Sequence, residues 1–145
     1  MKKDTTNLLI GAKVLNEILI YFNNTIIEEG GALLFDNSTN SLFLFIPLQN
    51  ISQNPSSEYL FSFDELNMKI GDYMNDNISF IGIIHSHQYS PLPSKDDINF
   101  FSNLIKENDY ECLLFPIYCH KAKPLIRWWM MNGKGVKEVT ITPIN

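Results

Sequence analysis

The pattern of apolar and polar residues predicts helices and strands in turn along the chain. Apolar residues recur at helical spacing from Ala12 to Phe22, so we predict a helix there that ends at Asn23-Asn24. The apolar runs GGALLFD and SLFLFIPL flank a turn-rich segment, residues 36–40, and predict a β-hairpin. The polar segment NISQNPSSEY that follows is predicted to be a loop.

A second helix is predicted after this loop, in the segment SFDELNMKIGDYMND. Ser62 or Asp64 suits its N-terminus, because either side chain can accept a hydrogen bond from a free backbone N–H group. Leu66, Ile70 and Tyr73 are spaced along one face and define its expected apolar side.

A buried strand and a third helix are predicted next. ISFIGIIHSH is apolar until its histidines, a pattern typical of a strand that is buried on both faces of a sheet. SKDDINFFSNLIKEND then predicts an amphipathic helix. Its expected inward positions are Ile98, Phe101, Leu104 and Ile105.

Three closing strands are predicted from CLLFPIYC, LIRWWMM and VKEVTIT. Pro116 within the first implies an edge position or a bulge, because proline has no N–H group for a strand neighbour. Strands and helices are interspersed, and no repeat or low-complexity linker divides the chain. We therefore predict a single α/β domain over residues 1–145, with a central mixed β-sheet flanked by helices.

Composition and charge narrow the classes of function. The chain has 145 residues, of which 45% are hydrophobic, so it can form a core. A net charge of −5 argues against a nucleic-acid-binding protein. The basic residues late in the chain are interpreted as ordinary solvated charge: Lys121, Lys123, Arg127, Lys134 and Lys137.

No apolar run approaches the roughly 18 residues that a membrane span needs. The two cysteines, Cys112 and Cys119, lack the close spacing of a zinc knuckle, and we see no secretory signal. We therefore expect a soluble, cytoplasmic protein that does not contact a membrane.

The candidate chemistry lies in IGIIHSHQYSPLPSKDD, where an apolar strand gives way to a loop and a helix. Side chains alternate along a strand, so His85 and His87 are expected on one face and Ser86 on the other. Two imidazoles at this spacing can bind one metal ion, and Asp97 follows after a proline-restrained loop. A His/His/Asp set leaves a fourth tetrahedral position for water, which is typical of a catalytic zinc site.

Two parts of this pattern also have simpler interpretations. Ser94 and Asp97 match a capping box, in which the serine begins a helix and the acidic residue lies at its third position. A hydrolytic zinc site also needs a base, and Glu28 and Glu29 beside a Gly-Gly pair are the candidates. From these residues alone, two exposed glutamates before a backbone bend are the favoured interpretation, so the base is left open.

In this order, EEGGALL, HSH and PSKDD resemble the MPN domain metalloproteases that carry the JAMM motif, especially the short prokaryotic, JAB-like members. That family combines a Glu-x-Gly-Gly-like strand start, His-Ser/Thr-His, a spacer and Ser-x-x-Asp. The resemblance covers Glu28 to Asp97, and the neighbouring predicted helices fall where the family places them. It implies an MPN fold with a cytidine-deaminase-like architecture.

The resemblance also implies a role for each matching residue. The expected ligands of one Zn²⁺ ion are His85, His87 and Asp97. Glu28 is the expected general base, with Glu29 as the alternative, and Ser94 is expected to stabilise the oxyanion. The chain departs from the family pattern in a spacer before Ser94 that is shorter by one residue, in Gln88 and in Phe35. The short spacer bears most on the role of Ser94.

The activity that the resemblance implies is a zinc-dependent peptidase or isopeptidase. It would cleave after the C-terminal tail of a ubiquitin-like or sulfur-carrier-like protein, in deconjugation or precursor processing, including in bacterial antiphage pathways. Gln88, Tyr89 and the polar loop from Asn50 to Tyr59 are the expected places for substrate contacts. The alternative is a non-catalytic MPN scaffold that binds a protein partner. A nucleobase deaminase is disfavoured, because the chain has neither His-x-Glu nor Pro-Cys-x-x-Cys.

Overall fold

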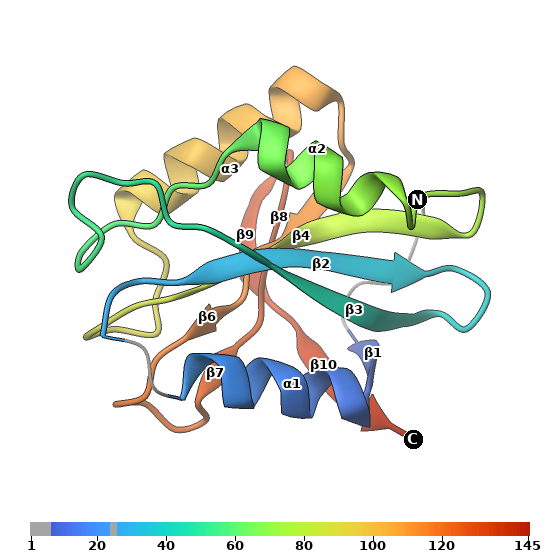
Figure 1. Cartoon of the computed structure of the whole chain (residues 1–145), viewed down its shortest axis with the longest axis horizontal. Helices are drawn as coiled ribbons and strands as arrows, with labels where there is room; N and C mark the ends of the chain where they lie inside the picture. Colours follow the sequence, from blue (N-terminus) through green and yellow to red (C-terminus); the bar gives the residue numbers. More distant parts are fainter. Residues whose placement is uncertain (1–6, 24–25) are drawn as a thin grey trace.

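The structure is a computed structural model that describes residues 7–23 and 26–145. In this part of the chain a curved β-sheet lies between helix α1 on one face and helices α2 and α3 on the other (Figure 1). Parallel and antiparallel strand pairs both occur, so the predicted α/β class with a mixed central sheet is confirmed. None of the helices in the described residues is both long and apolar enough to cross a membrane.

The described residues form three helices and ten strands. The helices are α1 (Ala12–Phe22), α2 (Phe63–Gly71) and α3 (Lys95–Asn108). The first strands are β1 (Asn7–Gly11), β2 (Gly30–Asp36), β3 (Ser41–Leu48), β4 (Ile78–Ser86) and β5 (Cys112–Leu114). The last are β6 (Ile117–Tyr118), β7 (Ile126–Arg127), β8 (Trp129–Asn132), β9 (Gly135–Glu138) and β10 (Thr140–Ile144).

Strand β4 lies near the middle of the sheet. The strand order is β10-β1-β3-β2-β4-β5-β8-β9, and β6 pairs with both β4 and β7. Strand β2 runs antiparallel to β3 and to β4, so the predicted hairpin is confirmed. This pairing places Gly30 directly opposite His85. The start of β2 therefore lies beside the end of β4.

Alternate residues of the central strands pack into two separate cores. Leu33 and Phe35 of β2 belong to the core beneath α1, whereas Ala32 and Leu34 belong to the core beneath α2 and α3. Ile83 of β4 packs in the second core. Because side chains alternate along a strand, His85 lies on the same face as Ile83, the face that α3 covers.

The N-terminal and C-terminal strands differ from the prediction. Strand β1 was not predicted, and each of the three predicted closing strands is divided into two shorter strands. Pro116 lies at the break between β5 and β6, and both of these strands have neighbours on two sides. The pairings on both sides also keep one register across Pro116, so the expected edge position or bulge is wrong. The missing N–H group is accommodated by an interruption of the strand instead.

The helices also differ from the prediction in detail. Helix α2 is shorter than predicted, because it ends at Gly71, and Tyr73 beyond it is 44% exposed. Ile98 is 38% exposed rather than inward, whereas Phe101, Leu104 and Ile105 of α3 are buried as predicted. Asn23 caps α1 as predicted, whereas Asn24 lies outside the described residues.

Candidate metal centre

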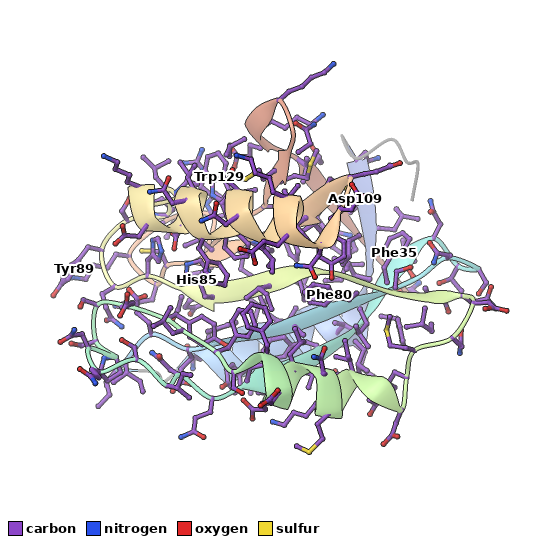
Figure 2. The ribbon with its side chains drawn as sticks, turned by 90° about the horizontal axis from the view of Figure 1, so that it is seen from above. Phe35, Phe80, His85, Tyr89, Asp109 and Trp129 are labelled. Carbon is purple, nitrogen blue, oxygen red and sulfur yellow. The ribbon has the colours of Figure 1, made fainter. Side chains whose placement is uncertain are left out.

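The two histidines and Asp97 converge at the end of β4. The Nε2 atoms of His85 and His87 lie 3.0 Å apart. One carboxylate oxygen of Asp97 lies 3.3 Å from Nε2 of His85, and the other lies 3.0 Å from Nε2 of His87. Figure 2 shows His85 at the end of β4, beside the start of α3. The predicted candidate ligands are therefore brought together.

The donor set of this cluster fits a divalent metal ion. Nδ1 of His87 lies 3.0 Å from the carbonyl oxygen of Ser90, which can only accept, so Nδ1 carries the proton. The Nε2 lone pair of neutral His87 then faces the Nε2 of His85 and the carboxylate of Asp97. One ligand atom from each residue lies within 4.8 Å of the others, an arrangement that a cation between them would stabilise.

Local contacts orient His87 and Asp97. The His87 N–H donates to the carbonyl of Tyr118 over 2.9 Å, and its ring donates to Ser90. Ser94 and Asp97 form the predicted capping box at the start of α3. The Ser94 hydroxyl oxygen accepts from the Asp97 N–H, and the Ser94 N–H donates to the Asp97 carboxylate, each over 3.0 Å. The cap therefore aims Asp97 at the imidazoles.

The two faces of the β4 end are used differently, as strand alternation predicts. The Ser86 hydroxyl points away from the cluster and accepts from the Glu29 N–H over 2.9 Å. The Ser86 N–H in turn donates to the Glu29 carbonyl over 2.8 Å. This reciprocal pair fixes where the segment before β2 lies against the metal cluster.

Neighbouring groups outweigh burial in setting the charge of Asp97 and His87. Burial opposes ionisation of Asp97, but in the metal-free protein the attraction of protonated His85 and His87 outweighs it and holds the pKa of Asp97 well below its ordinary value. Burial lowers the pKa of His87, but the Asp97 carboxylate and the Glu28 charge outweigh this effect, so its pKa is raised. The carboxylate is therefore ionised at neutral pH and available as a ligand.

Glu28 lies in the same cavity and is buried. Its exposed fraction is only 6%, and it is one of four polar or charged residues buried in the described residues. Burial raises the pKa of Glu28 to about 7, with the charge of His87 opposing and that of Asp97 adding to the rise. A carboxylate with this pKa can gain and lose a proton at neutral pH.

The structure separates Glu28 from Glu29. The Glu28 side chain lines the cavity together with the two histidines and Asp97. The Glu29 carboxylate accepts a hydrogen bond from the Tyr21 hydroxyl over 3.2 Å. Tyr21 belongs to α1, which covers the opposite face of the sheet (Figure 1). Of the two candidates for the base, only Glu28 faces the candidate metal site.

The cavity has a volume of about 470 Å³ and is open to solvent. One side is formed by the loop between β3 and α2, and the other by the loop between β4 and α3. Gln88, Tyr89 and Ser94 all line it, and their roles toward a substrate stay predictions. Tyr89 is 81% exposed and projects outward from its loop (Figure 2).

A family model agrees with this arrangement. The model described as prokaryotic homologs of the JAB domain matches residues 12–131, which is most of the chain. The chain belongs to this JAB family. The family includes metalloisopeptidases.

Solved structures with the same fold confirm the JAB domain architecture. A protein from Desulfitobacterium hafniense superposes with a TM-score of 0.70 at 22% identity, over 95% of this chain and 93% of that one. A JAB1/MPN domain protein from Archaeoglobus fulgidus gives a TM-score of 0.58 at 18% identity, over 95% of this chain and 100% of that one. Among curated proteins, the comparison finds no match.

Sequence reasoning placed Asn50 in a loop expected to contact substrate and missed its structural role in this JAB domain. Its side-chain N–H group donates to the carbonyls of Glu28 and Glu58, each over 2.8 Å. Its side-chain oxygen accepts from the N–H groups of Ser52 and Leu60. The polar, turn-rich run around Asn50 was the only signal in the sequence, and it indicated a loop rather than a link to Glu28.

Trp129 is the second residue that was missed. Its indole N–H donates to the carbonyl of Pro91 over 3.0 Å, and Lys121 lies 4.5 Å from the ring of Tyr89. Both contacts hold the loop between His87 and Ser94. Despite its shortness, this loop places Asp97 against the histidines and Ser94 in the cavity wall of the JAB domain.

Proposed function

We propose that the chain is a zinc-dependent peptidase or isopeptidase that cleaves after the C-terminal tail of a ubiquitin-like or sulfur-carrier-like protein. The observation that carries the proposal is the shared cavity. It combines three convergent ligand atoms with a buried carboxylate whose pKa is raised to about 7. Ligands without a base would fit a structural site equally well.

The ligand atoms and the cavity define what a metal ion would contribute. Nε2 of His85, Nε2 of His87 and one oxygen of Asp97 would hold it. A bound Zn²⁺ ion would supply Lewis-acid chemistry that activates water and polarises the scissile carbonyl. The open cavity leaves room for a substrate on the solvent side of the three ligands.

Glu28 and Ser94 would handle the proton and the developing charge. Glu28 would take a proton from the attacking water and return it to the leaving amine. The Ser94 oxygen already accepts from the Asp97 N–H, so its own O–H is free to donate to an oxyanion. No covalent bond between protein and substrate is needed in this scheme.

An extended protein tail suits the shape of this cavity. It is partly open to solvent, and it lies between the loop that carries Glu58 and Tyr59 and the loop that carries Gln88 and Tyr89. We propose Gln88 and Tyr89 as contacts for the tail. The products would be a free tail and either a deconjugated target amine or a trimmed precursor peptide.

The test uses purified protein and linear fusions of ubiquitin-like proteins, each joined through a C-terminal Gly-Gly to a reporter peptide. We expect about one zinc ion per chain. Cleavage after Gly-Gly should stop with a chelator and return with added Zn²⁺. Cleavage that continues in the presence of the chelator would contradict the mechanism. Partner binding without any cleavage, unaffected by Glu28→Gln, would favour the scaffold alternative.

A further inference from the structure

The side chains of the three candidate ligands are held by different kinds of contact. His87 donates from Nδ1 to Ser90, and Asp97 accepts from the Ser94 N–H. His85 is 3% exposed, and its Nδ1 has no hydrogen-bond partner among the described residues. A histidine that binds metal through Nε2 keeps its proton on Nδ1, where a hydrogen bond usually fixes the ring. Something else must therefore hold the imidazole of His85.

The rings around His85 take the place of that hydrogen bond. The Tyr59 ring is nearly parallel to the His85 imidazole, with an angle of 12° between the planes and 6.0 Å between the centroids. Phe101 packs against the imidazole at 6.4 Å and 30°. His87 meets it edge-on at 4.8 Å. These distances are within the range of favourable aromatic pairs, and such contacts restrict rotation of the imidazole.

Tyr59 is itself held by contacts to its hydroxyl and to its ring. Its hydroxyl donates to the carbonyl of Leu48 over 2.9 Å. Its ring lies against Gly30, the residue opposite His85 in the sheet. A Cβ atom on Gly30 would lie 2.6 Å from the Tyr59 ring, so only glycine leaves the space that the ring occupies. The glycine after Glu29 and the tyrosine of the loop therefore form one fitted contact.

We propose that Tyr59 is a positioning residue for the metal ligand His85. Its ring, rather than its hydroxyl, holds the imidazole in the orientation that directs Nε2 at His87 and Asp97. Tyr59 does not touch the metal or the substrate carbonyl in this role. The proposal rests on the metal-binding part of the proposed function and is independent of which protein tail is cleaved.

If Tyr59 positions His85 through its ring, loss of the ring should weaken metal binding, whereas loss of the hydroxyl alone should not. Tyr59→Leu removes the flat surface beside His85, so the imidazole must lose rotational freedom when the metal binds. We expect about tenfold weaker Co²⁺ binding, the scale seen when an outer partner of a metal-bound histidine is lost. Tyr59→Phe keeps the ring and loses only the bond to Leu48. Its affinity should stay within about twofold of the wild type.

The experiment titrates metal-free protein with Co²⁺ in competition with a chelator and records the visible absorption spectrum of the bound ion. Tyr59→Leu should weaken binding and change the spectrum, because the geometry of one ligand is altered. Tyr21→Leu is the matched control. It removes a tyrosine that contacts Glu29 and Phe45 on the α1 side of the sheet. Its affinity and spectrum should be unchanged.

Thermal unfolding of the metal-free variants shows whether each is folded, and Tyr59→Met replaces the leucine variant if that one is not. Wild-type affinity and spectrum in a folded Tyr59→Leu or Tyr59→Met variant would overturn the positioning role alone. An equal loss in Tyr59→Phe would assign the effect to the hydroxyl and would also overturn it. Wild-type protein that binds neither Co²⁺ nor Zn²⁺ would overturn the proposed function together with this inference.

Discussion

The metal-ligand cluster and the segment that carries Glu28 border the same cavity but are held by different contacts. His85, His87 and Asp97 belong to one continuous stretch of β4, loop and α3, and contacts to their side chains orient them. Glu28 is held through its backbone: its N–H donates to Pro55 over 2.7 Å and its carbonyl accepts from Asn50. The ligands are therefore fixed through their side chains, whereas the base is fixed through its main chain.

This difference means that the metal-ligand cluster and the segment of Glu28, the two halves of the site, can be disrupted separately. Changes in the ligand cluster should alter metal affinity first. Changes around Glu28 should alter turnover while leaving metal affinity intact. A variant that alters both would show that the halves are coupled.

Glu28→Gln should have the largest effect. The amide cannot accept the proton from water, so we expect turnover of the Gly-Gly fusion to fall by about 10³-fold, within the usual range for loss of a general base. Co²⁺ affinity should be close to that of the wild type. Glu29→Gln is the matched control and should retain turnover. If Glu29→Gln were inactive and Glu28→Gln active, the base would be assigned wrongly.

Asp97→Asn should mainly affect the metal-ligand cluster. The neutral amide is a poor ligand, so we expect Zn²⁺ affinity in a competition titration to fall by more than about 100-fold. Ser94→Ala removes the hydroxyl of the same cap but no ligand. It should cost about 1 kcal/mol in the free energy of unfolding, measured with urea, with little loss of metal affinity. Equal metal affinity in Asp97→Asn would leave Asp97 with a capping role only.

The raised pKa of Glu28 predicts a pH-dependent stability effect in the metal-free protein. Burial raises this pKa from 4.5 to about 7, so the fold disfavours the ionised form. The cost is fully present above pH 7 and disappears as pH falls toward the unfolded value. Glu28→Gln removes it and should stabilise the protein by about 2–3 kcal/mol at pH 8.5.

Urea unfolding of both proteins from pH 5 to 8.5 measures this difference, which should shrink toward pH 5. Glu29→Gln should instead lower stability, because it weakens the hydrogen bond with Tyr21. A pH-independent difference for Glu28→Gln would show that the carboxyl is not buried in solution.

Asn50→Ala should have a smaller effect, which acts on turnover through the segment of Glu28. It removes the hydrogen bonds that hold the Glu28 carbonyl and the adjacent loop. We expect about tenfold lower turnover at saturating Zn²⁺, because small displacements of a catalytic group reduce the rate. Co²⁺ affinity should not change. Ser52→Ala, whose hydroxyl contacts Glu58 and Asn54 in the same loop, is the control and should retain turnover.

The metal-ligand cluster could be predicted from the sequence because its geometry is local. Alternation along β4 places His85 and His87 on one face, and the capping box sets where Asp97 lies at the start of α3. The choice between Glu28 and Glu29 could not be made from the residues alone. It depends on Ser86 binding the Glu29 backbone and on Asn50 holding the Glu28 carbonyl, which are contacts between distant segments.

The same distinction applies to the fold. Helix α1 and the β2–β3 hairpin follow local patterns and agree with the prediction. Strand β1 was missed because its register is set by parallel pairing with β10, at the other end of the chain. The break between β9 and β10 was missed for a related reason. Strand β9 pairs with β8, whereas β10 pairs with β1, which lies at the other end of the chain.

The capping box at the start of α3 links helix formation to metal binding. One oxygen of Asp97 accepts from the Ser94 N–H and also faces Nε2 of His87. A folded first turn therefore presents the carboxylate in advance, and part of the ordering entropy of that ligand is lost during folding rather than on binding. In return, an ion bound at Asp97 would oppose fraying of this turn. The helix end and the metal site are thus thermodynamically coupled.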